Sequence, residues 1–121
     1  PTGEILEVAD SDMDFRTERE IAPHSPDFDT NYCLSDASRP LRDVLRLTGQ
    51  SGVSMTMATT APGIQFYDGR HAIRPDRAAY EGVAIEAQYW PDAPNNTDFP
   101  SIALAKGAVF HQETRWSFKR G

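Results

Sequence analysis

Glu86 is the residue in this sequence whose surroundings most clearly suggest chemistry. It lies within an otherwise apolar, strand-like run and is followed by Gln88, Tyr89 and Trp90. A buried carboxylate costs free energy unless it is paired or used. On a strand, Glu86, Gln88 and Trp90 share one face at intervals of about 6.6–6.8 Å. A carboxylate beside an aromatic ring and an amide is the composition of a sugar site and suggests a proton acceptor. On composition alone, a solvent-facing Glu86 remains the favoured alternative.

Two further polar residues fit the same chemistry. Asp29 ends an acidic loop just before a strand-like run, where a carboxylate can accept hydrogen bonds from neighbouring sugar hydroxyls. Gln65 lies inside the aromatic run IQFY and offers both a donor and an acceptor. Taken alone, Asp29 is better explained as a turn residue. Gln65 is equally well explained as a polar residue on an edge strand.

Other kinds of chemistry find little support in the sequence. His24, His71 and His111 are widely separated and have no ligand spacing to one another or to a cysteine, so no metal site is predicted. Cys33, the single cysteine, rules out an internal disulfide framework and is expected to be a small core residue rather than a nucleophile. No phosphate-binding glycine loop, HExxH or GxSxG motif is present.

The composition describes one acidic domain. The chain has 121 residues and a net charge of −6, which argues against nucleic-acid binding. No apolar run is long enough to span a membrane. Because the chain has one cysteine and no recognisable signal peptide, a cytoplasmic location is expected. Pro1 in place of an initiator methionine suggests a piece of a longer protein.

Closely spaced turn residues predict an antiparallel all-β domain of five to seven strands without a confident helix. The run at 41–47 is ambiguous, because its leucines fit either a helix or a strand, and residues 70–81 are expected to form an exposed loop. The remaining runs are predicted as strands: 5–8, 30–34, 53–59, 64–67, 83–90 and 109–118.

Several motifs resemble the C-terminal part of the aldose 1-epimerase (galactose mutarotase) family. They occur in the family's order along nearly the whole chain, and the Glu-x-Gln run followed by PDAPN and FPS is the most specific. The motifs are PTGEI at 1–5, DFR at 14–16, FDTNYCL at 28–34, TTAPGIQFYDG at 59–69, IEAQYWPDAPNNTDFPS at 85–101 and KGAVFHQETRWSFK at 106–119.

The resemblance implies a fold and an activity. The fold is an antiparallel β-sandwich of the galactose mutarotase type, of which residues 1–121 form the C-terminal part of a single domain without the N-terminal half. The activity interconverts the α and β anomers of a free aldose by acid–base ring opening, with no metal or cofactor. Matched by motif, Glu86 is the catalytic base, and Asp29 and Gln65 bind the substrate.

The chain also departs from the family pattern. Thr30 replaces the histidine that usually follows the aspartate, Ala87 replaces the threonine of Glu-Thr-Gln, and the loop after Gly69 is divergent. The family's acid histidine belongs to the N-terminal half and matches none of the three histidines here. The isolated chain is therefore expected to be inactive, and two alternatives remain: a non-catalytic carbohydrate-binding module, or a fragment active only with an N-terminal partner chain.

The expected ligand is a neutral monosaccharide of the aldohexose type, because no basic cluster is evident beside the site. Open sheet edges predict self-association or pairing with an N-terminal half chain.

Overall fold

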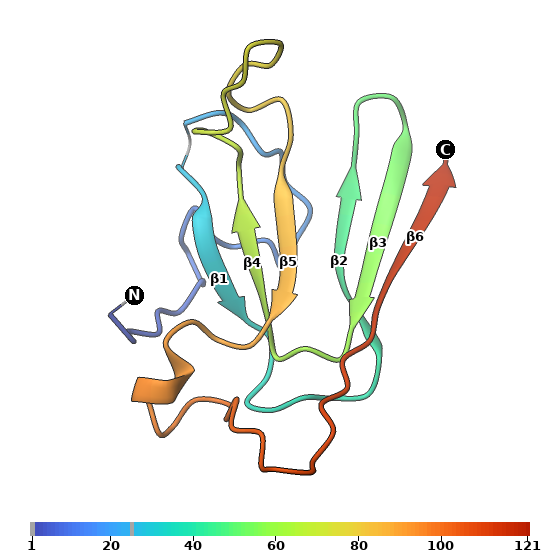
Figure 1. The fold of residues 1–121 in the computed structure, drawn as a ribbon. Coiled ribbons are helices and arrows are strands. Elements are labelled where there is room, and N and C mark those ends of the chain that lie inside the picture. The colour runs from blue at the N-terminus through green and yellow to red at the C-terminus, as the bar shows by residue number, and fades with distance from the viewer. Residues whose placement is uncertain (1, 25) are drawn as a thin grey trace.

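The computed structural model describes residues 2–24 and 26–121, which form two antiparallel sheets of three strands each (Figure 1). Pro1 of the first motif lies outside the described residues. The first sheet has the order β1 (Asp29–Cys33), β4 (Gly63–Tyr67), β5 (Ala84–Gln88), and the second has the order β2 (Arg42–Thr48), β3 (Val53–Thr59), β6 (Thr114–Arg120). The one helical turn among these residues is the 3₁₀ helix η1 (Ala93–Asn95). The all-β antiparallel class predicted from the sequence is confirmed.

The ambiguous run at 41–47 forms strand β2, which joins β3 in a hairpin. The turn between them contains Gly52 at φ 81°, a backbone conformation that a side chain would strain. The Gly49 amide closes the turn by donating to the Val53 carbonyl at 2.9 Å. The leucine pattern at 41–47 fits a helix as well as a strand, so it is the pairing with β3 that makes this run a strand.

Residues 60–62 carry the chain from β3 in the second sheet to β4 in the first (Figure 1). Arg42 holds this crossover in place. Its Nη1 donates to the Thr59 carbonyl at 2.9 Å, and its Nη2 donates to Ser35 Oγ at 3.0 Å and to the Ala61 carbonyl at 3.4 Å. Ala61 and Pro62 of the crossover are buried, and the crossover fixes where β4 begins.

One face of the first sheet is covered by an aromatic cluster. Phe28 is fully buried, with its ring centroid 5.5 Å from that of Phe15 and 5.2 Å from that of Phe66. Phe15 also meets Tyr32 on the same face, at 6.3 Å. Such aromatic pairs contribute about 0.5–1.5 kcal/mol each beyond the area they bury. The N-terminal segment therefore packs on this apolar face and leaves the other face for polar residues.

The apolar face of the second sheet is only partly covered. On this face Met55 of β3 pairs with Phe118 of β6, and Met57 pairs with Trp116. Met57 is fully buried, whereas Trp116 is 42% exposed and Phe118 is 67% exposed. The apolar side chains of this face are therefore more exposed on the edge strand β6 than at Met57 of β3.

One predicted strand is wrong, and another is confirmed only in its second half. Residues 5–8 form no strand, and Leu6 is 73% exposed. The final strand begins at Thr114 rather than at Val109, because Thr114 pairs with Thr59, the last residue of β3. A strand needs a partner along its length, and β3 offers none to residues 109–113.

In the part of the chain that the structure describes, no helix is long and apolar enough to cross a membrane. Nor do the residues at 2–24 and 26–121 contain a group of three or more His, Cys, Asp or Glu side chains placed to hold a metal ion.

Candidate functional site

The polar face of the first sheet gathers the predicted site residues. Strand pairing places Gln65 directly opposite Asn31 on one side and directly opposite Glu86 on the other. Directly paired residues of antiparallel strands project from the same face. Asn31, Gln65 and Glu86 thus form a row across β1, β4 and β5.

Strand alternation explains why this face is polar. Ile64, Phe66 and Ile85 lie between the polar positions and project to the aromatic cluster on the other face. The replacement of the family's threonine by Ala87 falls on that apolar face, opposite Ile64. It therefore leaves the polar row unchanged.

Asp29 belongs to the same face and contacts Gln65. Gln65 Nε2 donates to Asp29 Oδ1 at 2.8 Å. This hydrogen bond fixes the amide so that its carbonyl oxygen is free to accept a bond from a ligand hydroxyl. The structure thus brings Asp29, Gln65 and Glu86 together, although they are far apart in the sequence.

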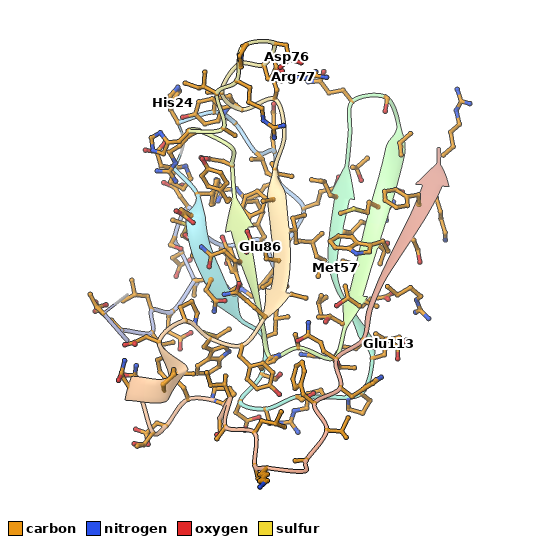
Figure 2. All side chains as sticks on the ribbon, in the orientation of Figure 1. His24, Met57, Asp76, Arg77, Glu86 and Glu113 are labelled. Carbon is orange, nitrogen blue, oxygen red and sulfur yellow. The ribbon has the colours of Figure 1, made fainter. Side chains whose placement is uncertain are left out.

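Glu86 lies at the middle of β5, and its side chain is exposed (Figure 2). The solvent-facing position that composition favoured for Glu86 is therefore the observed one. The apolar neighbours Ile85 and Ala87 project to the opposite face, so they do not desolvate it. An exposed carboxylate is free to meet a ligand without losing an internal partner.

One end of the polar face is tightly packed around Gly63, where the side chains of Asn31, Gln88 and Trp90 meet. Gln88 Nε2 lies 3.4 Å from Asn31 Oδ1, and Trp90 Nε1 donates to the Pro62 carbonyl at 3.0 Å. A Cβ atom at Gly63 would lie 3.0 Å from Trp90 Cδ1 and 3.2 Å from Asn31 Oδ1. A residue without a side chain is needed here for the indole and the amide to approach β4.

The PDAPNNTDFP loop holds Trp90 from its other side. Phe99 packs edge-on against the indole, with ring centroids 5.1 Å apart. Asn96 Nδ2 donates to the Asp92 carbonyl at 2.9 Å, which ties the two ends of the helical turn η1 together. The loop therefore positions one wall of the polar face.

Cys33 and Tyr67 also lie on this face, at its two ends. Cys33 is exposed, so the expectation of a core residue is wrong. Desolvation by neighbouring atoms nevertheless raises the pKa of its thiol, which disfavours the nucleophilic thiolate near neutral pH. Tyr67 pairs with Asp29, and its hydroxyl accepts a 2.7 Å hydrogen bond from the His71 amide.

Asp68 anchors the entry to β1 and so helps to place Asp29. It is 5% exposed, and its Oδ2 accepts a 2.9 Å hydrogen bond from the Phe28 amide. Its Oδ1 accepts hydrogen bonds from the Arg70 amide at 3.0 Å and from Arg70 Nε at 3.2 Å. Burial acts to raise the pKa of Asp68, but these hydrogen bonds outweigh it and lower the pKa below its ordinary value of 3.8.

The three histidines have other contacts or lie in the solvent. His24 sits near the end of the first sheet, away from Glu86 (Figure 2), and its Nδ1 is 2.8 Å from the Tyr80 hydroxyl. His71 and His111 are exposed. The structure gives none of them a hydrogen bond to Asp29, Gln65 or Glu86.

Sequence reasoning named Glu86, Gln88 and Trp90 as one face but did not assign Asn31 or Tyr67 to the site. A signal for Asn31 was present in the DTN run, because residues two apart on a strand share a face. Tyr67 follows from Gln65 by the same rule.

Comparison with known proteins identifies the family of the chain. The family model described as aldose 1-epimerase matches residues 1–117. Galactose mutarotase from Bos taurus is 33% identical over 131 aligned positions, and that from Homo sapiens is 31% identical over 133; each alignment covers 98% of this chain and 38% of the relative. The chain thus spans 38% of the length of these curated relatives.

A solved structure shows the same fold. The crystal structure of the GalM/aldose epimerase homologue from C. elegans superposes with a TM-score of 0.85 at 26% sequence identity, covering 99% of this chain and 40% of that one. The β-sandwich type expected from the sequence is thereby confirmed. The chain belongs to the aldose 1-epimerase family.

Proposed function

We propose that this chain carries the base and part of the sugar-binding surface of an aldose 1-epimerase site. The observation that supports the proposal most is the direct pairing of Gln65 with Glu86, with Asp29 bonded to the same amide at 2.8 Å. Three residues chosen from separate motifs thus meet on one sheet face. A sugar lying across β1, β4 and β5 would contact all of them.

The proposed chemistry is proton transfer. Glu86 accepts the proton of the C1 hydroxyl of the cyclic sugar while an acid protonates the ring oxygen. The bond from C1 to the ring oxygen breaks and C1 turns about its bond to C2. The ring then closes with the opposite anomeric configuration, as Glu86 returns its proton to the C1 oxygen and the acid recovers its proton from the ring oxygen. Asp29 and Gln65 hold sugar hydroxyls during these steps. None of the three histidines, all of which the structure describes, hydrogen-bonds to Asp29, Gln65 or Glu86, so the acid is expected from another polypeptide segment.

The expected substrate is a free aldohexose, and the sequence favours a neutral one. A cytoplasmic location also remains a prediction from the sequence. The chain by itself, with a base and no acid, is expected to bind the sugar without accelerating mutarotation.

Polarimetry tests the reaction. The 121-residue chain is added to freshly dissolved α-D-galactose, and the rotation is expected to relax at the spontaneous rate. A chimera tests the base: residues 1–121 replace the matching 38% of bovine galactose mutarotase. We expect the chimera to accelerate relaxation and Glu86→Gln to reduce its rate about 10²–10⁴-fold.

The control is Glu113→Gln, an exposed carboxylate outside the first sheet, which should leave the rate unchanged. Rapid Glu86-dependent relaxation by the isolated chain would show that no outside acid is needed. An active chimera that is indifferent to Glu86→Gln would refute the assignment of the base. Sugar binding by the chain combined with a folded but inactive chimera would favour the alternative of a carbohydrate-binding module.

A further inference from the structure

The divergent loop after β4 forms a pocket next to the polar face. The pocket has a volume of about 330 Å³. Tyr67 and Ala84 line its inner side, and Arg74, Arg77 and Glu81 line the loop side. Tyr67 pairs with Ala84, one position farther along the same face from the pair Gln65 and Glu86. That step is about 7 Å, so the pocket adjoins the proposed sugar site.

The loop has a defined shape. Its two ends meet where Gly69, at φ 75°, lies against the Gly82 carbonyl so closely that a Cβ atom would not fit. Tyr80 and Ala72 both donate backbone hydrogen bonds to the Gly69 carbonyl, at 3.3 and 2.9 Å. Ion pairs from Arg70 to Asp68 and to Asp27, each at 3.2 Å, secure the same region to the sheet.

Arg74 and Arg77 form a small arginine hairpin at the tip of this loop, residues 74–77. Each donates its backbone amide to the carbonyl of the other at 3.1 Å, and the two form an antiparallel bridge. Paired residues project to the same side, so two positive side chains lie next to one another. Like charges directly opposite one another are destabilising unless something of opposite charge joins them.

The protein itself supplies only part of that opposite charge. Glu81 is 3.7 Å from Arg77, and both side chains are largely exposed, which makes this a weak ion pair. Among the residues the structure describes, no carboxylate lies within ion-pair distance of Arg74. On its loop side the pocket is thus lined by two arginines and one carboxylate, which leaves that side with a net positive charge.

We propose that the pocket binds an anionic group, a phosphate ester or a carboxylate, at the end of the aldose remote from C1. Guanidinium groups suit both of these oxyanions. The inference rests on the proposed function, because it places C1 at Glu86 and the far end of the sugar beyond Tyr67. It changes the expected substrate from a neutral hexose to an anionic one. Arg74 and Arg77 line the same pocket as Tyr67 of the polar face, a proximity that the linear sequence does not reveal.

Binding to the 121-residue chain tests the inference without requiring catalysis. Dissociation constants for galactose, galactose 6-phosphate, galacturonate and inorganic phosphate are measured by calorimetry at low ionic strength. We expect at least one anionic sugar to bind about tenfold or more tightly than galactose, with the advantage falling as salt is added. The two sugar anions distinguish a phosphate substrate from a carboxylate one.

Variants assign the effect to the arginines. The double variant Arg74→Ala/Arg77→Ala should remove the advantage of the anionic sugar and leave galactose binding unchanged. The control Arg46→Ala/Arg120→Ala removes the same charge from exposed positions on the second sheet and should preserve the advantage. Glu81→Gln should strengthen anion binding.

The outcomes separate this inference from the proposed function. Equal binding of galactose and both anionic sugars, or an advantage that survives the double variant, overturns the pocket assignment while the function stands. Binding of inorganic phosphate that depends on Arg74 and Arg77, without binding of any sugar, supports an anion site and overturns the proposed function. Absence of binding by all four ligands overturns both.

Discussion

Gln65 donates a 2.8 Å hydrogen bond to Asp29, across the pair of strands β1 and β4. The two residues are 36 positions apart in the chain. This bond orients the amide of Gln65 beside Glu86, its direct partner on β5. The relationship makes two residues of the polar face act as one hydrogen-bonding unit.

Asp29→Ala should weaken galactose binding about tenfold, since it removes one charged acceptor and leaves the Gln65 amide without its partner. Because Asp29 is exposed, the free energy of unfolding should change by less than about 0.5 kcal/mol. An NMR titration with galactose measures the first effect and urea denaturation the second. Asp43→Ala, an exposed aspartate on β2, is the control. Unchanged sugar affinity in Asp29→Ala would remove Asp29 from the site.

Gly63→Ala should destabilise the fold by about 1–3 kcal/mol. The added Cβ would meet Trp90 Cδ1 at 3.0 Å and the Tyr32 carbonyl oxygen at 3.2 Å, and the backbone oxygen has little room to move. Displacement of the indole should also shift its fluorescence. Gly82→Ala is the matched control, because nothing lies within 4 Å of a Cβ atom there. Equal stability of the two variants would contradict the packing described around Gly63.

Asp68→Asn should lower the free energy of unfolding by about 1–3 kcal/mol at pH 7, because the buried carboxylate accepts hydrogen bonds from Phe28 and Arg70. The pKa of Asp68 is lowered in the folded state, so its stabilising effect is present above the unfolded value of about 3.8. The effect is lost as the pH falls from there through the lower folded pKa. Urea denaturation at pH 7 and at a series of values below pH 4 should show the two proteins converging. A gap that widens in acid would reverse the assigned direction of the pKa shift.

Arg42→Lys should cost about 1–2 kcal/mol of stability, since an ammonium group cannot span the Thr59 carbonyl and Ser35 Oγ as the guanidinium fork does. The control is Arg46→Lys on the same strand, whose side chain is exposed. Thermal unfolding compares the two. A larger loss in Arg46→Lys than in Arg42→Lys would show that the crossover does not depend on Arg42.

Phe118→Lys should reduce self-association of the chain. Phe118 is 67% exposed on edge strand β6, and an apolar side chain beside an open strand edge invites pairing with another chain. Sedimentation velocity over a range of concentrations measures the effect. Ser117→Lys adds the same charge on the opposite face of β6 and should have a smaller effect. A wild-type chain that stays monomeric at high concentration would contradict the prediction of association.

Local pattern was sufficient for much of the strand content. Residues 53–59 are predicted as a strand and form β3, whereas the run at 41–47 is identified as β2 only through its pairing with β3. Pattern failed where a strand depended on a distant partner. Residues 5–8 look like a strand but have no partner, and β6 begins only where β3 supplies one.

The sequence by itself determined the family, the all-β class and which residues alternate toward each face, because these depend on residue type and on the two-residue repeat of a strand. Only the tertiary structure decided that Asn31, Gln65 and Glu86 form one row, since the register between strands is set by long-range hydrogen bonding. It also decided that Glu86 is exposed and that Arg74 lies beside the polar face. Exposure and proximity depend on how separate segments pack against one another, and no local pattern contains that information.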